Sequence, residues 1–400
     1  MSSPSARRAL FVQPFGIAGR GGGGPRILTS MARGQPFEAL SINCHQGRAQ
    51  PVDWIEQRHV PLRPPLGRID RTRFAGIGYW SEVLARPFFE RRLAAEMDAW
   101  TPQVVHLLPH WTCDFSAAWR HARLRGWRVV MSIHDDLAYA LPGNHPLRKY
   151  ALGMLAKMWP DVDLVFSISQ ELGDEYNARY GKRSFEIITD GVEKIADRPA
   201  PIVPGRLRVY FMGLFHYTYR ENLQALTRAL AAIKREQPGL DIQLVMRCGG
   251  FQPGIDAAFP AQVLPFAGQA TVLRDMETAD LLYMPLPFGR EHEGFTRFSL
   301  STKMVSYLGS GVPVLFHGPH DSAAAHLLER NRAAVICSSL DPAEITTVIK
   351  SAVAPETRRQ IVENALNFAR TAFPMAELRR RFLLGLFPGA GAAVLRDPSP

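Results

Sequence analysis

The sequence contains few cysteines and lacks any long hydrophobic segment. Only four of its 400 residues are cysteine, Cys44, Cys113, Cys248 and Cys337, and they lie far apart. This spacing forms neither the paired motifs of a zinc ribbon nor the dense framework of a disulfide-stabilised domain. We therefore expect reduced thiols and a cytoplasmic protein.

The sequence also shows no segment typical of membrane insertion or export. No apolar run approaches the roughly 18 residues that a membrane-spanning helix requires. The opening stretch, MSSPSARRALFVQPFG, leads into a strand-like segment without the apolar core of a signal peptide. We expect neither export nor a transmembrane anchor.

The composition is that of a folded protein with an excess of positive charge. Hydrophobic residues make up 46% and charged residues 21%, which excludes a disordered chain, and the length favours two domains of roughly 200 residues each. The formal net charge is +10. Such an excess suits nucleic acid, anionic lipid or phosphorylated small molecules, and charge alone does not choose among them.

Short apolar runs recur along both halves of the chain, separated by segments long enough for helices. Because these runs are apolar throughout instead of at every second residue, they predict parallel strands covered on both faces. A proline-rich stretch, 198–205, separates the two series. The expected strands are Leu10 to Val12, Ala39 to Ile42, Val104 to Leu108, Val129 to Ile133, Leu164 to Ile168 and Ile187 to Val192, then Leu207 to Met212, Ile242 to Met246, Leu281 to Met284 and Val312 to Phe316. The pattern predicts an α/β fold of two tandem Rossmann-like, doubly wound domains.

We place the domain boundaries from this pattern and from the prolines. The N-terminal domain is expected over 1–195, a linker over 196–206 and the C-terminal domain over 207–372. The remaining residues, 373–400, are expected to form a helix and a tail, because Met375 to Phe387 is apolar and arginine-rich at helical spacing.

Ligands of doubly wound sheets bind at the carboxyl ends of the strands, so polar residues after the N-terminal runs are site candidates. Gly23 and Gly24 end a glycine-rich segment, which allows close backbone approach to a ligand, although a flexible loop would have the same composition. His134, Asp135 and Asp136 follow another run. Three polar groups at a strand end are hard to satisfy by packing, so we expect His134 to bind a sugar hydroxyl and one aspartate to accept a proton.

The C-terminal half carries cations and hydroxyls at equivalent positions. Ser301, Thr302 and Lys303 begin an expected helix, where hydroxyls, free amides and an ammonium group suit a pyrophosphate. The further candidates in this half are Gly213, Arg220, Arg247, Gly249 and, in the loop 286–301, Glu293.

Taken together, these motifs resemble the GT-B glycosyltransferases, particularly the group-1 or family 4 type. The resemblance rests on the ordered set formed by the glycine loop, Val129 to Asp135, Asp163 to Ser169, Asp190 to Val192 and the long segment Ser301 to Val314. It implies a nucleotide-sugar donor held by the C-terminal half, an acceptor held by the N-terminal half, a cleft between them and a C-terminal helix that crosses back to the N-terminal domain.

The resemblance also implies roles for individual residues. Lys303 would meet the donor diphosphate, His134 the transferred sugar, and Arg220 or Arg247 would supply a second positive group without a bound metal or other cofactor. The implied set is catalytic His134, Asp135, Asp136 and Glu293, donor-binding Gly213, Arg220, Arg247, Gly249, Ser301, Thr302 and Lys303, and acceptor-binding Gly23, Gly24 and His110.

One departure from the family pattern bears on the chemistry. The family usually carries two glutamates in the segment before Gly311, and this chain has Phe298 and Ser306 at those positions. Glu293 lies upstream in a shifted register. Retention through Glu293 and inversion through Asp135 or Asp136 therefore both stay open.

The implied function is transfer of a hexose-type sugar (EC 2.4) from a nucleotide-diphosphate donor to a glycan or lipid-linked acceptor, in bacterial surface-polysaccharide synthesis. The alternatives are a sugar-nucleotide epimerase or hydrolase on the same fold, and a non-catalytic scaffold. Nucleic acid is not an expected partner, because the cations are scattered.

Two basic segments raise the question of lipid binding. The stretches Trp80 to Trp100 and Leu147 to Trp159 combine cations with large apolar residues. Either can lie on an anionic membrane surface, which would make the protein peripheral at the inner face of the cell membrane, or pack one apolar face on the core.

Overall fold

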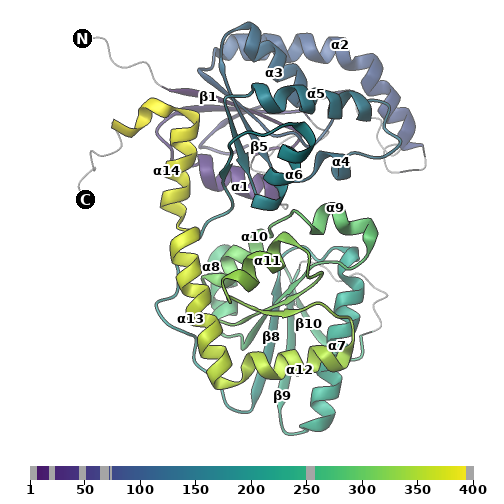
Figure 1. The fold of residues 1–400 in the computed structure, drawn as a ribbon, viewed down its shortest axis with the longest axis vertical. Helices are drawn as coiled ribbons and strands as arrows, with labels where there is room; N and C mark the ends of the chain where they lie inside the picture. The colour runs from purple at the N-terminus through teal and green to yellow at the C-terminus, as the bar shows by residue number, and fades with distance from the viewer. Residues whose placement is uncertain are drawn as a thin grey trace. The chain divides into compact units, whose positions relative to one another are not determined.

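The computed structural model describes residues 7–17, 23–44, 51–63, 72, 74–248 and 257–392. The chain divides into two compact units. Unit 1 comprises Met1–Thr189 and Ala376–Pro400, and unit 2 comprises Asp190–Met375. Each unit is a parallel sheet with helices alongside it (Figure 1), which confirms the predicted pair of Rossmann-like domains.

Unit 1 contains a seven-stranded parallel sheet in the order β3-β2-β1-β4-β5-β6-β7. Its strands are β1 (Arg8–Gln13), β2 (Glu38–Asn43), β3 (Glu56–His59), β4 (Val104–Leu107), β5 (Arg128–Ile133), β6 (Leu164–Ser167) and β7 (Glu186–Ile187). Its helices are α1 (Gly23–Ala32), α2 (Ala75–Trp100), α3 (Asp114–Leu124), α4 (Leu137–Ala140), α5 (Arg148–Asp161), α6 (Gln170–Tyr180) and α14 (Met375–Leu386), followed by a 3₁₀ turn, η4 (Pro388–Ala392).

Unit 2 contains a six-stranded parallel sheet in the order β10-β9-β8-β11-β12-β13. Its strands are β8 (Arg206–Met212), β9 (Asp241–Arg247), β10 (Ala261–Leu264), β11 (Leu281–Pro285), β12 (Val314–His317) and β13 (Val335–Cys337). Its helices are α7 (Arg220–Glu236), α8 (Gln269–Glu277), α9 (Glu293–Thr296), α10 (Thr302–Leu308), α11 (Ala323–Arg330), α12 (Pro342–Val353) and α13 (Pro355–Ala372), with 3₁₀ turns η2 (Tyr217–Tyr219) and η3 (Arg290–His292).

Alternation along β8 shows why both faces of its sheet are covered. Tyr210 and Met212 join a buried cluster with residues of α10 and α13, whereas Val209 and Phe211 join a second cluster with residues of α7 and α12. Because every residue of such a strand meets apolar neighbours, the strand reads as one continuous apolar run.

The sequence-based strand limits differ from the structure at two places. The expected strand Ile187 to Val192 is limited to β7, Glu186–Ile187, because Val192 instead forms a bridge with Pro374 in unit 2. The expected strand from Val312 begins at Val314, after Pro313, whose ring removes the backbone N–H that a central strand would donate.

The C-terminal helix α14 packs on the sheet of unit 1, as predicted. The Phe382 ring lies 6.4 Å from that of Phe11, 5.6 Å from His106 and 5.4 Å from Phe166, measured between centroids. At Gly385 a Cβ would come within 2.3 Å of Phe166, so only glycine allows this approach. The helix therefore completes the core of unit 1.

The segment expected as a linker packs within unit 2. The backbone N–H groups of Ala196 and Ala200 donate to the carbonyls of Gly309 and Gly311, each at 2.8 Å. The units divide at Thr189/Asp190, a few residues before the expected boundary at 195, and again at Met375/Ala376.

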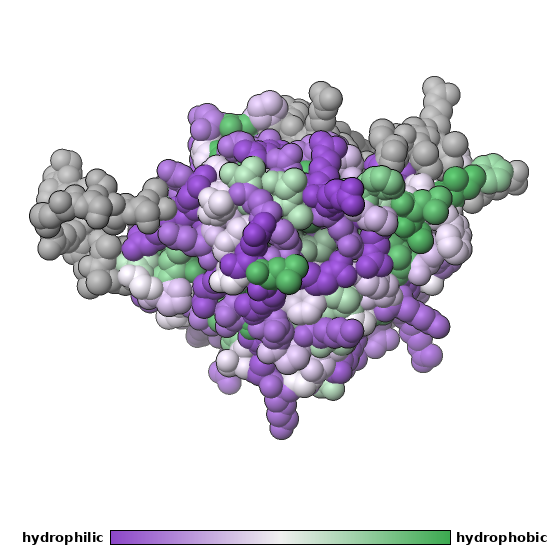
Figure 2. Space-filling model, turned by 90° about the horizontal axis from the view of Figure 1, so that it is seen from above, coloured by the Kyte–Doolittle hydropathy of each residue, from purple (hydrophilic) through white to green (hydrophobic). Residues whose placement is uncertain are grey.

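Tryptophan and cysteine are unevenly placed along the chain and between core and surface. All seven tryptophans of the sequence precede Asp190 and thus belong to unit 1. The four cysteines are buried and form no disulfide with one another. The face seen in Figure 2 is largely hydrophilic, with hydrophobic surface gathered on its right side. Among the described residues, no helix is both long and apolar enough to cross a bilayer.

Candidate functional site

In unit 1, His134 follows β5 and lies almost fully buried, with 9% of its surface exposed. Its Nδ1 atom is buried and has no hydrogen-bond partner among the described residues. Burial, aided by the positive charge of His110, lowers the pKa of His134 to about 3. The imidazole is therefore neutral near pH 7 and offers a hydrogen-bonding nitrogen instead of a cation.

The start of α1 approaches this histidine closely. A Cβ on Gly24 would lie 2.8 Å from the ring of Phe15 and 3.6 Å from Nδ1 of His134. Gly24 is thus required for the close packing of the loop after β1, whereas Gly23 is exposed at the first position of α1. Both predicted glycines lie where α1 begins, and Gly24 faces His134.

The other predicted residues of unit 1 divide into two environments. His110 Nδ1 lies 3.6 Å from the carboxylate of Asp135, and both side chains are about one-third exposed. Asp136 is nearly buried, caps α4 by accepting from the Ala138 N–H at 3.1 Å, and binds Arg179 at 2.9 and 3.0 Å. The geometry favours Asp135 over Asp136 as an accessible base, because Asp136 already holds local structure.

In unit 2, Lys303 extends over the end of β8. Its Nζ lies 4.7 Å from the ring centroid of Phe211 and 5.3 Å from that of Tyr219. Gly213 has a φ of +97°, and a Cβ there would meet Lys303 Cε at 3.1 Å. The lysine stem therefore lies against the glycine backbone, with its ammonium group over two aromatic faces.

The ammonium of Lys303 is poorly compensated. Within the described part of the chain no carboxylate pairs with it, and burial lowers its pKa to about 8. Desolvation disfavours the charged form, and the aromatic rings offset only part of that cost. With a pKa of about 8 the amine is still largely protonated at pH 7, and an anion bound beside Nζ would raise that pKa again.

Local contacts fix the position of this lysine. Ser301 caps α10 by accepting from the backbone N–H of Lys303 at 3.3 Å. One turn later, the hydroxyl of Tyr307 accepts from the backbone N–H of Met212 at 2.9 Å. Thr302 is the first residue of α10. The helix is thereby joined to the end of β8, where Gly213 follows.

The other predicted residues of unit 2 have different surroundings. Arg247 forms an ion pair with Asp275 and donates to the Pro265 carbonyl at 2.8 Å, so its guanidinium is already engaged. Arg220 is exposed at the start of α7, and Glu293 is exposed at the start of α9. Gly249 lies outside the described residues.

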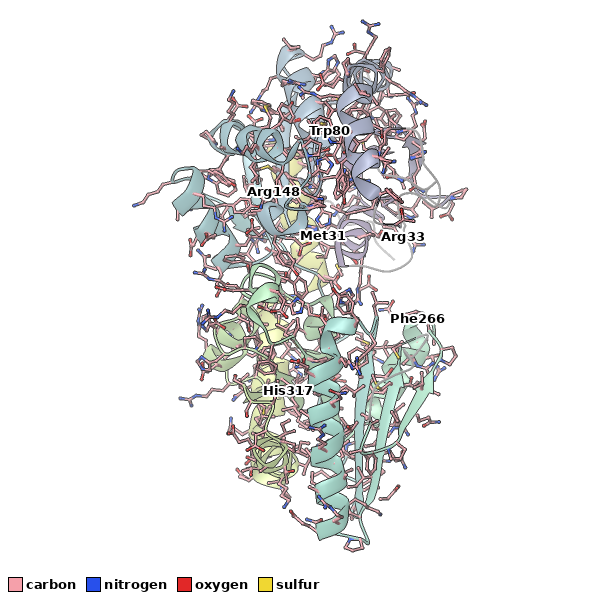
Figure 3. The ribbon with its side chains drawn as sticks, turned by 90° about the vertical axis from the view of Figure 1, so that its right-hand side faces the viewer. Met31, Arg33, Trp80, Arg148, Phe266 and His317 are labelled. Carbon is pink, nitrogen blue, oxygen red and sulfur yellow. The ribbon has the colours of Figure 1, made fainter. Side chains whose placement is uncertain are left out.

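The sequence reasoning did not select two further histidines of unit 2, His216 and His317. His216 caps the turn η2, with its Nδ1 2.9 Å from the Thr218 hydroxyl. Burial and the nearby charge of His292 lower its pKa. His317, labelled in Figure 3, is instead a buried residue held by Tyr283 and the Ser339 carbonyl, each at 2.8 Å.

No metal site is formed by the part of the chain that the structure describes, since no three His, Cys, Asp or Glu side chains are grouped to hold an ion. The expectation that transfer needs no metal stays a prediction.

Comparisons with known proteins add to this geometry. The model of Glycosyltransferase Family 4 matches residues 56–195. The sucrose-phosphate synthase from Thermosynechococcus elongatus has a similar structure, with 13% identity, a TM-score of 0.64 and coverage of 94% of this chain and 97% of that chain. No curated protein sequence gives a significant match.

Two further solved structures show the same likeness. The α,α-trehalose 6-phosphate synthase from Burkholderia multivorans has 13% identity and a TM-score of 0.62, with 98% of this chain and 100% of that chain covered. HepE from Anabaena, solved with UDP and glucose, has 14% identity and a TM-score of 0.59, with 94% and 98% covered. The resemblance predicted from the sequence is confirmed: the chain has the fold of the GT-B glycosyltransferases, and its residues 56–195 match Glycosyltransferase Family 4.

Proposed function

We propose that the protein transfers a sugar from a nucleotide-diphosphate donor to a hydroxyl group of a glycan or lipid-linked acceptor. The observation that carries this proposal is Lys303, an ammonium group held on Gly213 and two aromatic rings without a carboxylate partner in the described chain. A diphosphate would supply the missing anion.

The chemistry follows from charge. Transfer breaks the bond between the anomeric carbon and the diphosphate oxygen, so negative charge develops on the leaving group, and Lys303 stabilises it. The acceptor hydroxyl forms the new bond to the anomeric carbon and loses its proton to a carboxylate or to the departing phosphate. Neutral His134 supplies a hydrogen bond to a sugar hydroxyl, and Asp135 is the carboxylate nearest to it in sequence that remains partly accessible.

Two neighbouring folds suggest the first donors to try. HepE was solved with UDP and glucose, and two similar structures are described as UDP-forming trehalose-phosphate synthases. We therefore propose a UDP-sugar as the first donor to test. The proposed setting, a bacterial surface-polysaccharide pathway in the cytoplasm, rests on the sequence resemblance.

The test is nucleotide binding by Lys303→Met. Methionine keeps an apolar stem on the aromatic rings, so the melting temperature should stay equal or rise, because burial of an ammonium is costly. UDP binding should weaken roughly 10- to 100-fold, the loss expected for one charge-assisted contact. Isothermal titration calorimetry measures the affinity directly.

The matched control is Lys194→Met, which removes an exposed lysine of the same unit. Equal affinity of Lys303→Met and Lys194→Met for every nucleotide tested would remove Lys303 from a donor site. Release of nucleotide diphosphate from a sugar donor then distinguishes a transferase or hydrolase from a non-catalytic scaffold. A transferase or hydrolase releases nucleotide diphosphate slowly without acceptor, and a scaffold releases none.

A further inference from the structure

The first half of α2 exposes a row of large apolar side chains. Phe74, directly before the helix, and Ile77 are 52% and 55% exposed, and Trp80, Leu84 and Phe88 are 63%, 77% and 75% exposed. These five residues, the α2 apolar stripe, are spaced by three or four positions and so lie on one face of the helix. Trp80 is labelled on this helix in Figure 3.

The opposite face of α2 is buried: Phe89, Leu93 and Met97 pack in the core of unit 1, and the carboxylate Glu82 lies on the same face nearer the start of the helix. The Glu82 side chain is only 3% exposed and accepts hydrogen bonds from Trp111 Nε1 at 3.2 Å and Thr112 Oγ1 at 3.1 Å. Arg63 and His145 lie 3.4 and 3.2 Å from the same carboxylate. An ordinary surface helix has one apolar face and buries it, whereas α2 buries one face and leaves a second row of apolar side chains exposed. The buried network fixes the helix with the stripe facing solvent.

Cations continue the stripe at its C-terminal end. Arg91 and Arg92 are exposed one turn beyond Phe88, and neither has a carboxylate partner among the described residues. The acidic residues of α2 are all engaged elsewhere. Glu82 is held as described above, Glu90 pairs with Arg86 and Arg120, Glu96 with Arg58, and Asp98 with Arg125. The exposed face therefore combines large apolar side chains with uncompensated positive charge.

We propose that the α2 apolar stripe docks on an anionic lipid surface, with its apolar side chains at the acyl boundary and Arg91 and Arg92 among the headgroups. A helix with Trp, Phe and Leu on one face and arginines beside them has the composition of an interfacial helix. Figure 2 shows hydrophobic surface gathered on the side where α2 begins in Figure 1. The second basic segment, now α5, is a poorer match because Met154, Leu155 and Trp159 are buried.

Charge argues for lipid over a second copy of the chain. An isologous dimer would bury the stripe against itself and bring the arginines of both copies into one interface. No acidic residue of α2 is available there to neutralise them, because each is already paired. Anionic lipid headgroups would neutralise Arg91 and Arg92 directly. The proposal is independent of sugar transfer, although with the proposed function it makes a lipid-linked acceptor the natural substrate.

The experiment is co-sedimentation of the full chain with vesicles of phosphatidylcholine, alone or mixed with phosphatidylglycerol. The double variant Leu84→Glu/Phe88→Glu should lower the partition coefficient on mixed vesicles at least about tenfold, because two large apolar side chains leave the interface. Arg91→Gln/Arg92→Gln should abolish the preference for mixed over neutral vesicles. Leu124→Glu is the control, since Leu124 is an apolar residue of α3 that is 84% exposed outside the stripe.

Two results would overturn the proposal. One is equal sedimentation of the wild type and Leu84→Glu/Phe88→Glu. The other is a wild-type dimer by light scattering that Leu84→Glu/Phe88→Glu converts to a monomer, with no vesicle binding, which would assign the stripe to a second copy. UDP binding measured on the same variants separates this test from the proposed function, because the substitutions lie in unit 1 and Lys303 belongs to unit 2.

Discussion

At the scale of single residues, Asp114 is the least expected ionisable group in unit 1. It is fully buried at the first position of α3. Burial, with a smaller effect from the negative charge of Glu82, raises the pKa of Asp114 to about 7. The folded protein therefore holds this proton at a pH where the unfolded chain has lost it.

This shift predicts a pH-dependent loss of stability. Because the pKa is higher in the folded state, the stabilisation is present at low pH and is lost as the pH rises from about 4 to about 7. Asp114→Asn removes the titration, so at pH 8 it should be more stable than the wild type by an amount of the order of a few kcal/mol. Melting temperatures at pH 5 and 8 measure the effect.

Asp53→Asn is the control for this measurement, because Asp53 is exposed. Parallel pH profiles for Asp114→Asn and the wild type would contradict the raised pKa. The comparison of variants is needed because burial lowers the pKa of His106 and His134, and those groups change stability in the opposite direction at lower pH.

The sequence identified site residues where one strand end carries several polar groups. His134 follows a buried strand directly, and Lys303 begins a helix with two hydroxyl residues, so local pattern was enough to select both as candidates, and their roles stay predictions. It could not identify the partner of Arg247, because Asp275 lies 28 positions away and meets it only through the fold. The positions of Phe211 and Tyr219 beneath Lys303 could likewise not be predicted, since aromatic residues in or shortly after a strand usually indicate core packing.

At the scale of secondary-structure elements, α10 holds the candidate donor site together. Its Tyr307 hydroxyl accepts the Met212 N–H at the end of β8, and both groups are buried. Tyr307→Phe should therefore cost about 1–3 kcal/mol of unfolding free energy, because it leaves the N–H without a partner. Nucleotide affinity should also fall several-fold as Lys303 loses its fixed position against Gly213. Denaturant unfolding and calorimetric titration measure the two effects.

A destabilising change far from α10 tests whether that loss is specific. Ile349→Val, in the buried face of α12, should cost a comparable 0.5–1.5 kcal/mol or so and leave nucleotide affinity unchanged. If both variants lose affinity equally, α10 contributes only general stability.

Which strands could be predicted depended on their place in the sheet. The central strands β1, β4, β5, β8 and β11 are buried almost throughout, so their apolar runs were recognised. The edge strands β3 and β10 have the sequences Glu-Gln-Arg-His and Ala-Gln-Val-Leu and remain partly exposed. An edge strand needs no continuous apolar run, so nothing in its residues distinguishes it from a loop.

At the scale of the whole molecule, the distribution of tryptophan makes the two units separately observable. Since all seven tryptophans belong to unit 1, intrinsic tryptophan fluorescence reports on unit 1, whereas far-UV circular dichroism reports on both units. Phe382→Ala removes the ring that closes the core of unit 1 and should cost roughly 3–5 kcal/mol there.

We expect Phe382→Ala to shift the fluorescence midpoint to lower denaturant and to split the dichroism curve into two phases, as unit 2 keeps its own core. Phe266→Ala, at a residue that is 61% exposed in unit 2, should leave both signals in place. A dichroism curve that shifts as a single transition together with the fluorescence would mean that the two units unfold as one.

Unit 1 is built from two segments of the chain with unit 2 between them, and this sets the order in which its parts are synthesised. The core of unit 1 is formed by the first 189 residues but is closed by α14, which is synthesised only after the whole of unit 2. At about 5–20 residues per second, the sheet of unit 1 waits roughly 10–40 s for that helix while all of unit 2 is made. A newly made unit 1 therefore exposes the faces of Phe11 and Phe166 during this time, and a nascent chain stalled before α14 should be a preferred substrate for chaperones.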